Sequence, residues 1–533
     1  MRTAHPGRGS KRLRLGESST CRTPSADARC TCRHGAEERR SRCYTEAPLA
    51  TAEPIPTVAR SPLNSRPLRL HLVAIGGTGM APLACLLQAQ GHVVSGSDAP
   101  LYPPMSQLLE QAGIRPQVGY AAAHLDPAPD LVIVGNAVRS DNPEAVEAER
   151  LGLPRLSMPE ALARFFLADR RPLVIAGTHG KTTTSAMAAW VWSQCGRDPG
   201  FLIGGVPIDL EVSFRQGSGD RFVVEGDEYN AAFFDRGAKF LHYRPQTLLL
   251  TSVEYDHADL YPSPEALRAA YARLISIVPE SGLIVACGDS AELRELAGAA
   301  HAPVVFYGEE ENNPVCLLGT PEADSAGIRF RVRDESGETV TVRMPMWGVH
   351  NAVNALAVFA AARREGIELE PLLAALAGFR GVKRRQEQLA DQDGVVVIDD
   401  FAHHPTAVEK TLGSMRMRFP GRRLLACFEP RSLTAGRAFL LEGYARAFRG
   451  ADRAFFAPIF HRDRLLPEDR LDLEALARDL SLAGTPTFLA GDLDALFERV
   501  RDELRAGDVV LTMSSGSFGG LPRRLADAVR SGI

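Results

Sequence analysis

The sequence contains no apolar run long enough to cross a membrane and no large excess of charge of either sign. Its formal net charge is -4 and its isoelectric point is near 6.4, which gives no reason to expect nucleic acid or an anionic membrane as a partner. Residues 1–66 lack the continuous apolar stretch of a secretory signal. These absences argue against membrane-spanning, secreted and nucleic-acid-binding classes, and they favour a cytoplasmic protein that acts on small molecules.

The amino-terminal segment differs from the rest of the chain. Residues 1–66 hold thirteen Lys and Arg against six Asp and Glu, with many Ser, Thr, Pro and Gly, and this composition predicts a disordered basic tail. Four of the nine cysteines fall there, but their spacing, with His34, matches no zinc pattern. A wrongly assigned start is a second interpretation, because ordered sequence is expected only from about Leu68. The other five cysteines stand in apolar surroundings, which predicts buried thiols in a reducing cytoplasm.

Length and patterning predict three ordered domains of the α/β class. A chain of 533 residues with 45% hydrophobic residues can build several cores. Strands, Gly-rich turns and helices alternate along it, as is typical of mostly parallel sheets. We expect a Rossmann-like domain over 67–169, a linker at 169–172, a central P-loop-type ATPase domain over 170–380 and a second Rossmann-like domain over 381–533.

Residues 173–184 read LVIAGTHGKTTT and form the most informative motif of the chain. A short β-prone run leads into Gly-x-x-Gly-Lys-Thr-Thr, and a helix is expected at 184–192. This order aims backbone N–H groups and a helix N-terminus at one point, where phosphate oxygens can bind. Lys181 adds a positive charge near the β- and γ-phosphates, and Thr182 adds a hydroxyl for Mg²⁺. The strict motif has Gly where this chain has Ile175, so a solvent-exposed turn is the alternative.

A second Gly-rich turn begins the ordered chain. Gly76-Gly77-Thr78-Gly79 lies between a strand expected at 69–75 and a helix expected at 80–90. The next strand, at 92–96, ends in Ser97-Asp98, and an acidic residue about 20 positions after such a turn commonly binds ribose hydroxyls. The full G-x-G-x-x-G pattern is missing, so NAD is not favoured, and a packing turn is the alternative.

Acidic residues follow two expected strands of the central domain. Glu225 ends one strand, and the segment 254–259 (EYDHAD) follows another. Carboxylates at the carboxyl ends of parallel strands face the ligand crevice, and Mg²⁺ prefers hard oxygen ligands, so Glu225 fits a metal role. His257 is ambiguous because a histidine ligand for Mg²⁺ is unusual. For Asp227 and Asp259 a solvated loop end is as good an interpretation as a metal site.

Two further groups of polar residues lie at expected element ends. Asn351 and Asn354 are three apart on one face of an Ala-rich helix, where their amides could read an adenine edge; ordinary first-turn polar residues are the alternative. In the third domain, polar segments follow three expected strands and a basic cluster precedes them: Lys383-Arg384-Arg385, Asp399–Pro405, Glu429–Ser432 and Ser514–Gly520. Because parallel strands end at one edge, the sequence predicts a ligand-binding edge there.

From Leu68 onward the order of these motifs resembles the Mur ligases, the ATP-dependent amide-bond-forming enzymes of bacterial peptidoglycan. The segments GTHGKTTT, EGDEY, EYDHAD, GVHNAVNA, GVKRRQE and DDFAHHPT occur in family order and at family-like spacing. The resemblance covers all three expected domains. It implies that the first domain binds the UDP part of a UDP-muramyl substrate, the second binds Mg²⁺ and ATP, and the third binds the incoming amino acid or peptide.

The resemblance also assigns roles to single residues. The implied catalytic residues are Lys181, Glu225, His257 and His403, and the implied metal ligands are Thr182, Glu225 and His257. ATP binding is assigned to Gly177, Thr178, His179, Gly180, Lys181, Thr182, Thr183, Asn351, Arg385 and Asp400. UDP-sugar binding is assigned to Gly76, Gly77, Thr78, Gly79, Met80, Ser97, Asp98 and Asn136, and peptide binding to Arg431, Ser432 and Gly516.

Two branches of the family fit the sequence. One joins L-alanine to UDP-N-acetylmuramate in peptidoglycan synthesis and usually carries an HRY-type segment after the strand expected at 424–428. The other joins the tripeptide L-alanyl-γ-D-glutamyl-meso-diaminopimelate to UDP-N-acetylmuramate in recycling, and it shows EPRS-x-T there, as this chain does at 429–434. Segments 102–106, 135–137 and 203–207 also resemble the second branch. We therefore expect the tripeptide as acceptor, with L-alanine as the alternative.

Other classes of function fit less well. A non-catalytic or purely ATP-hydrolysing module on the same fold is expected to lose one of Lys181, Glu225 or His257, and all three are present. A Rossmann oxidoreductase is disfavoured by the incomplete fingerprint at 76–79. Some Mur ligases use a carbamylated lysine near a second metal, a feature we expect to be absent because residues 240–382 contain no Lys. We expect the enzyme to be a monomer.

Overall fold

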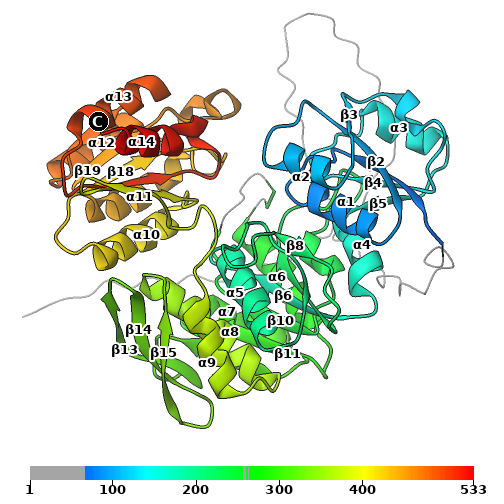
Figure 1. Cartoon of the computed structure of the whole chain (residues 1–533), viewed down its shortest axis with the longest axis horizontal. Helices are drawn as coiled ribbons and strands as arrows, with labels where there is room; N and C mark the ends of the chain where they lie inside the picture. Colours follow the sequence, from blue (N-terminus) through cyan, green and yellow to red (C-terminus); the bar gives the residue numbers. More distant parts are fainter. Residues whose placement is uncertain (1–65, 256–259, 262, 533) are drawn as a thin grey trace, which may run out of the picture. The chain divides into compact units, whose positions relative to one another are not determined.

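Figure 1 shows the computed structural model of the protein, which describes residues 66–255, 260–261 and 263–532. The tail expected at 1–66 lies outside the described residues except for Arg66, and so does the motif segment 256–259. The described chain forms α/β domains with mostly parallel sheets, as the sequence predicts. In this part of the chain, no helix combines the length and the apolar character needed to span a membrane.

The first domain has five parallel strands in the order β3-β2-β1-β4-β5 (Figure 1). Its main elements are β1 (Arg69–Val73), α1 (Met80–Ala89), β2 (Val93–Asp98), α2 (Met105–Gln111), β3 (Gln117–Val118), β4 (Leu131–Val134), α3 (Pro143–Arg150), β5 (Arg155–Ser157) and α4 (Met158–Leu162). The strand order reverses direction at β1, and in such sheets ligands bind outside the carboxyl ends of the strands at the reversal. The turn at 76–79 lies there.

The central domain is built on a ten-stranded sheet in the order β15-β14-β13-β12-β11-β10-β6-β9-β7-β8. Its elements are β6 (Arg171–Ala176), α5 (Lys181–Gln194), β7 (Gly200–Leu202), β8 (Phe214–Arg215), β9 (Arg221–Gly226), β10 (Thr247–Leu250), α6 (Pro264–Ser276), β11 (Leu283–Cys287), α7 (Ala291–Leu296), β12 (Val304–Gly308), β13 (Val315–Asp324), β14 (Gly327–Arg333), β15 (Thr339–Met344), α8 (Val349–Arg364) and α9 (Leu369–Gly378). Trp192 and Phe359 are almost fully buried, so α5 and α8 are anchored in one core. The strand β6, which leads into the phosphate loop, lies between β9 and β10.

The C-terminal domain has six strands in the order β16-β17-β21-β18-β19-β20, and only the β16–β17 pair is antiparallel. Its elements are β16 (Glu387–Gln392), β17 (Val395–Asp400), α10 (Pro405–Arg418), β18 (Leu424–Phe428), α11 (Leu441–Ala447), β19 (Arg453–Phe456), α12 (Leu473–Leu482), β20 (Thr487–Leu489), α13 (Leu493–Glu503), β21 (Val509–Met513) and α14 (Leu521–Arg530). Alternate residues of β17 enter two cores: Val396 and Ile398 pack with α10 and α12, whereas Val395 and Val397 pack with α13 and α14. Burial on both faces explains the continuous apolar run.

Several element boundaries differ from the sequence prediction: β1 ends at Val73 rather than at residue 75, and β2 runs over Val93–Asp98 rather than 92–96. The helix after the phosphate loop begins at Lys181 rather than Thr184, because Gly180 is left-handed, with φ 82°, and ends the loop immediately before it. The linker expected at 169–172 is shorter, because β6 begins at Arg171. Pro172 is tolerated as the second residue of that strand, where it pairs in register with Phe222.

Candidate active site

The loop between β6 and α5 has the geometry of a phosphate cradle. Gly177 and Gly180 both have positive φ, 137° and 82°. A Cβ atom on Gly177 would lie 2.2 Å from Thr251 Oγ1, and one on Gly180 would lie 2.7 Å from Asn354 Oδ1, so both positions require glycine. The N–H of Thr178 donates to Ser252 O at 2.9 Å. The loop is therefore held against the segment that follows β10.

Lys181 is the first residue of α5 and lies over this loop. Its Nζ donates to Gly177 O at 2.7 Å and to Glu228 Oε2 at 3.0 Å. Burial alone would lower the pKa of Lys181, but the carboxylates of Glu228, Asp227 and Glu225 outweigh it and raise the pKa. The lysine is therefore charged, as a residue that binds the β- and γ-phosphates must be.

Hard oxygen ligands lie beside the lysine. Thr182 Oγ1 accepts a hydrogen bond from Arg385 Nη2 at 3.1 Å, and Gly204 N–H donates to Glu225 Oε1 at 3.0 Å. Burial and the neighbouring Asp227 raise the pKa of Glu225 to about 7, a shift that a bound cation would oppose. Two of the three predicted metal ligands thus suit Mg²⁺. The third, His257, lies outside the described residues, together with Asp259.

A cavity of about 560 Å³ adjoins the phosphate loop and matches a nucleotide in size. Six of the predicted ATP-binding residues line it: His179, Gly180, Thr183, Asn351, Arg385 and Asp400. Asn351 is buried and its Nδ2 donates to Trp347 O at 2.8 Å, while Asn354 Nδ2 donates to Asn351 Oδ1 at 3.4 Å. The two asparagines therefore lie on the cavity wall, as their spacing predicts.

Asp400 lies in the same cavity at the end of β17. Its carboxylate accepts hydrogen bonds from Gln386 N–H at 2.8 Å and from Ala402 N–H at 2.7 Å. Burial raises the pKa of Asp400 above its usual range, although the Arg385 guanidinium opposes the shift. That guanidinium also stacks on Phe401, 4.6 Å from the ring centre. Asp400 is thus a fixed acceptor, which suits its predicted role in ATP binding.

Arg431 and Gly516, two predicted peptide-binding residues, meet at the carboxyl edge of the C-terminal sheet. A Cβ atom on Gly516 would lie 1.9 Å from Arg431 Nε, so only glycine allows this approach. The guanidinium lies 3.8 Å from the ring centre of Phe460, and its Nη1 lies 3.5 Å from Glu429 Oε2. Ser432 is placed differently, because its Oγ accepts from Ala435 N–H within a turn. Arg431 is therefore held in place at this edge by Phe460 and Glu429.

The adjacent histidines of the DDFAHHPT motif have different surroundings. His403 Nδ1 lies 3.0 Å from Phe401 O, and His403 does not line the described cavity. The ring centre of His404 lies 5.0 Å from that of His179 in the phosphate loop. The structure thus brings His404, rather than His403, to the loop, and the general-base role of His403 stays a prediction.

In the first domain, Asp98 contacts the Gly-rich turn, and its predicted contact with ribose hydroxyls stays a prediction. Its Oδ2 accepts from Gly76 N–H at 2.7 Å and its Oδ1 accepts from Tyr120 at 3.1 Å. Thr78 and Asn136 are exposed at this edge. Gly77 and Gly79 lie in the same turn, and Met80 offers only its backbone because its side chain is buried. Ser97 requires a correction: its side chain is fully buried and donates to Glu144, so it supports the edge from within.

Three family models match the chain in succession. The Mur ligase family catalytic domain matches residues 69–170, the Mur ligase middle domain 175–362 and the Mur ligase glutamate ligase domain 384–516. A UDP-N-acetylmuramate--L-alanyl-gamma-D-glutamyl-meso-2,6-diaminoheptandioate ligase from Escherichia coli K12 is 39% identical over 87% of this chain and 98% of that protein. The chain belongs to the Mur ligase family.

Further relatives agree with this assignment. A UDP-N-acetylmuramate--L-alanine ligase from Halorhodospira halophila is 34% identical over 87% of this chain and 94% of that protein. The crystal structure of a murein peptide ligase from Psychrobacter arcticus is 34% identical, with a TM-score of 0.66 over 87% of this chain and 99% of that chain. A UDP-N-acetylmuramate-alanine ligase from Thermotoga maritima is 25% identical, with a TM-score of 0.72 over 87% and 100%. Since Mur ligases are ATP-dependent and form amide bonds, this chain is an ATP-dependent ligase.

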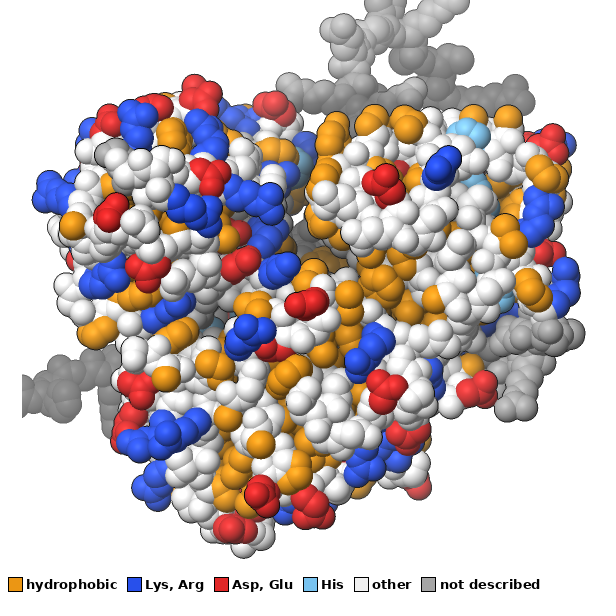
Figure 2. Space-filling view, in the orientation of Figure 1, with side chains coloured by type: hydrophobic (Ala, Val, Ile, Leu, Met, Phe, Trp, Pro, Cys, Tyr) orange, Lys and Arg blue, Asp and Glu red, His pale blue; other side chains and the backbone are white. Residues whose placement is uncertain are grey.

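Sequence reasoning missed several residues of this Mur ligase site. Glu228 pairs with Lys181, and Glu254 lies beside the phosphate loop. Both belong to recognised motifs, EGDEY and EYDHAD, but the sequence alone gave neither residue a role. The signal that could have identified them was their position: Glu228 is next to Asp227, and Glu254 follows β10. Two further cavity residues, His350 and Gln386, lie in the segments GVHNAVNA and GVKRRQE but were given no role there, whereas Asp289 and Lys410 lie in no recognised motif. Basic and acidic side chains lie interspersed on the face shown in Figure 2, in keeping with the formal net charge of -4.

Proposed function

We propose that this Mur ligase joins the tripeptide L-alanyl-γ-D-glutamyl-meso-diaminopimelate to UDP-N-acetylmuramate, a step of peptidoglycan recycling. The observation that carries the proposal is the arrangement of Arg431, held by Phe460 and Glu429 against Gly516 at the ligand edge. It belongs to the EPRS segment typical of this branch. Ligases whose printed names give this activity, from Escherichia coli and Haemophilus influenzae, are 39% and 35% identical to the chain.

The reaction requires two anions to meet. The lactate carboxylate of UDP-N-acetylmuramate attacks the γ-phosphorus of ATP, the bond to the β–γ bridging oxygen breaks, and ADP leaves. Lys181, with its raised pKa, and the amides of the loop offset the charge repulsion and stabilise the transferred phosphoryl group. The neutral α-amine of the peptide then attacks the acyl carbon, gives its proton to a base such as His403, and phosphate leaves.

Mg²⁺ fits the residues beside the loop. Thr182 and Glu225 offer hard oxygens, and Glu225 is a half-buried carboxylate with a raised pKa, whose charge a cation would stabilise. We propose that these two residues hold the ion, and that His257, which the family resemblance assigns as a metal ligand, is the third ligand. When bound, Mg²⁺ would neutralise charge on the phosphates.

Substrate choice is tested by ADP release with UDP-N-acetylmuramate and either the tripeptide or L-alanine. We expect kcat/KM to be at least about a hundredfold higher for the tripeptide than for L-alanine. One charge-assisted contact worth about 3 kcal/mol would produce a difference of this size. A preference for free L-alanine would replace the recycling function by the biosynthetic one.

The role of Arg431 is tested by the Arg431→Ala variant. We expect kcat/KM for the tripeptide to fall by about tenfold or more, because a carboxylate loses its bidentate partner. ATP affinity should stay unchanged, since Arg431 does not line the ATP cavity. Arg462→Ala, which removes an exposed arginine two residues after Phe460, is the matched control and should behave like the wild type. Equal losses in both variants would contradict the contact.

A further inference from the structure

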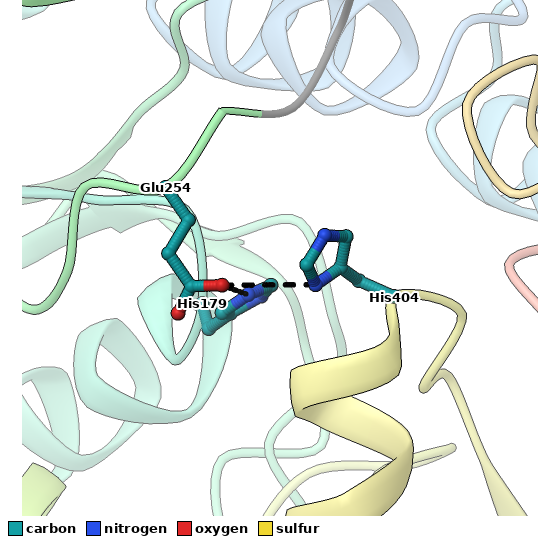
Figure 3. A group of neighbouring side chains, drawn as sticks. All are labelled: His179, Glu254 and His404. Carbon is teal, nitrogen blue, oxygen red and sulfur yellow. Dashed lines mark ion pairs between the residues drawn. The ribbon is translucent and has the colours of Figure 1, made fainter. Parts of the chain in front are cut away.

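Three potential metal ligands from separate segments meet beside the phosphate loop. His179 belongs to the loop itself, Glu254 follows β10, and His404 immediately precedes α10. In Figure 3 both imidazole rings lie beside the carboxylate of Glu254. Glu254 Oε2 lies 3.4 Å from His179 Nε2 and 3.8 Å from His404 Nδ1. The three ligand atoms all lie within 4.8 Å of one another.

These separations are close to those of a zinc site. Ligand atoms bound tetrahedrally at the usual zinc distances lie roughly 3.3 Å apart, so each pair of ligand atoms here would have to approach by at most about 1.5 Å. Thr406 Oγ1 donates to Glu254 Oε2 at 2.8 Å and so orients the carboxylate, as outer partners of metal ligands do. The Glu254 side chain is 36% exposed, which leaves a path for an ion.

We propose that His179, Glu254 and His404 bind a divalent transition-metal ion of the Zn²⁺ type, separately from Mg²⁺. Two imidazoles and one carboxylate form the ligand set of many zinc sites that keep a fourth position open. Mg²⁺ is a poor occupant, because it prefers oxygen ligands and octahedral geometry. Glu225, one of the proposed Mg²⁺ ligands, is not a member of this cluster.

The bound ion would join two domains. His179 and Glu254 belong to the central domain, whereas His404 belongs to the C-terminal domain. Glu254 already accepts a hydrogen bond from Thr406 across this boundary, so the ion strengthens an existing contact. Because His179 also lines the ATP cavity, the ion would hold the C-terminal domain to the phosphate loop. Zn²⁺ should therefore slow turnover, which requires substrates and products to enter and leave.

The site is tested by titrating the full-length, metal-free protein with Co²⁺ in the presence of saturating Mg²⁺. We expect one equivalent to give the visible bands of tetrahedral Co²⁺, without a thiolate charge-transfer band. The absence of that band separates this site from the four cysteines of the tail. His404→Gln and Glu254→Gln should each weaken binding by at least about tenfold, since even changes to outer partners commonly cost that much. Two variants keep the test decisive if one fails to fold.

Two histidines provide matched controls. His403→Gln changes the adjacent residue, whose ring lies by Phe401 O, and should leave Co²⁺ binding unchanged. His242→Gln changes a second cluster among the described residues, which consists of Glu160, Asp235 and His242. Glu160 in that cluster already accepts a hydrogen bond from Ser157 N–H, so this variant should also leave Co²⁺ binding unchanged. Equal binding by the wild type, His404→Gln and Glu254→Gln would overturn the site.

The domain link is tested by ADP release with and without Zn²⁺. We expect Zn²⁺ to inhibit the wild type and the His242→Gln control, and to inhibit His404→Gln at least about tenfold more weakly, relative to each variant's own metal-free rate. Full activity of a wild-type enzyme that binds Co²⁺ at this site would overturn the link. The Co²⁺ titration needs neither the UDP-sugar nor the peptide, so its result is independent of the proposed acceptor.

Discussion

The first and central domains each place a Gly-rich turn between a buried parallel strand and a helix, but the charges at the two turns are opposite. In the first domain, Gly76 N–H donates to the carboxylate of Asp98. In the central domain, α5 begins with Lys181, which lies over the loop and pairs with Glu228. The backbone arrangement is shared, whereas the charged partner differs.

The glycines also serve different purposes in the two turns. Gly177 and Gly180 adopt positive φ, which curls the loop so that its N–H groups can converge. In the first turn the left-handed residue is Ala74, with φ 64°, and a Cβ on Gly76 would lie 2.0 Å from Leu101 Cδ2, so a larger residue there would require the leucine side chain to move. The comparison teaches that two turns with the same strand–turn–helix order differ in charge and in loop curvature, and these two properties are what our proposed ligands, phosphate at one turn and hydroxyl groups at the other, depend on.

The largest effect should come from Lys181→Ala. We expect kcat to fall by more than about tenfold, because losing a group that stabilises transition-state charge commonly costs several kcal/mol. Acyl phosphate formation and ADP release measure the loss, and binding of UDP-N-acetylmuramate to the first domain should persist. Lys239→Ala, which removes a lysine paired with Asp227, is the control and should have a much smaller effect. Retention of more than about a tenth of kcat by Lys181→Ala would end the phosphate assignment.

A smaller effect is expected at the first turn. Asp98→Ala should weaken UDP-N-acetylmuramate binding by about tenfold, because a charged acceptor for ribose is worth about 1.5 kcal/mol or more. Titration calorimetry measures this affinity, and ATP affinity should not change. Asp130→Ala is the matched control, because Asp130 accepts from Arg69 N–H at the opposite end of the same strand, β1. Equal weakening by both variants would show that the effect is structural.

The last effect is on stability rather than on activity, and it concerns the buried carboxylate behind the first turn. Glu144 is desolvated, which raises its pKa, but hydrogen bonds from His71, Ser97 and His124 outweigh this and lower the pKa below 4.5. A carboxyl whose folded pKa is depressed stabilises the protein above its unfolded pKa, and this stability is lost as the pH falls through the folded value. Glu144→Gln should therefore destabilise the first domain near neutral pH by about 1–3 kcal/mol.

Urea denaturation of the wild type and Glu144→Gln measures this difference. The difference in the free energy of unfolding between the two proteins should shrink as the pH falls below about 4.5, because Glu144 in the unfolded chain becomes protonated there. Glu149→Gln, on the same helix but 73% exposed, is the control and should leave the transition near that of the wild type. A difference that does not depend on pH would mean that packing, rather than ionisation, explains the loss.

The sequence predicted most of the fold because its periodic patterns are local. Strand β18 has the predicted bounds, since it is a short apolar run that ends at polar residues. The start of α5 was predicted three residues late, because the left-handed turn at Gly180 is a backbone property that residue type only permits. Among site residues, the cavity lining was found best, because Asn351, Arg385 and Asp400 lie in recognisable motifs.

By itself, the sequence determined the order of the motifs, the phosphate loop with Lys181, and the family. Only the tertiary structure decided which neighbour in a motif reaches the site. His404 rather than His403 lies beside His179, and Ser97 points into the network of Glu144 instead of toward the turn. The physical reason is that consecutive residues after a strand project in different directions, and the direction depends on how the chain enters the next helix. Contacts between segments far apart in sequence, such as Glu254 with Thr406, form only when separate domains supply the partners.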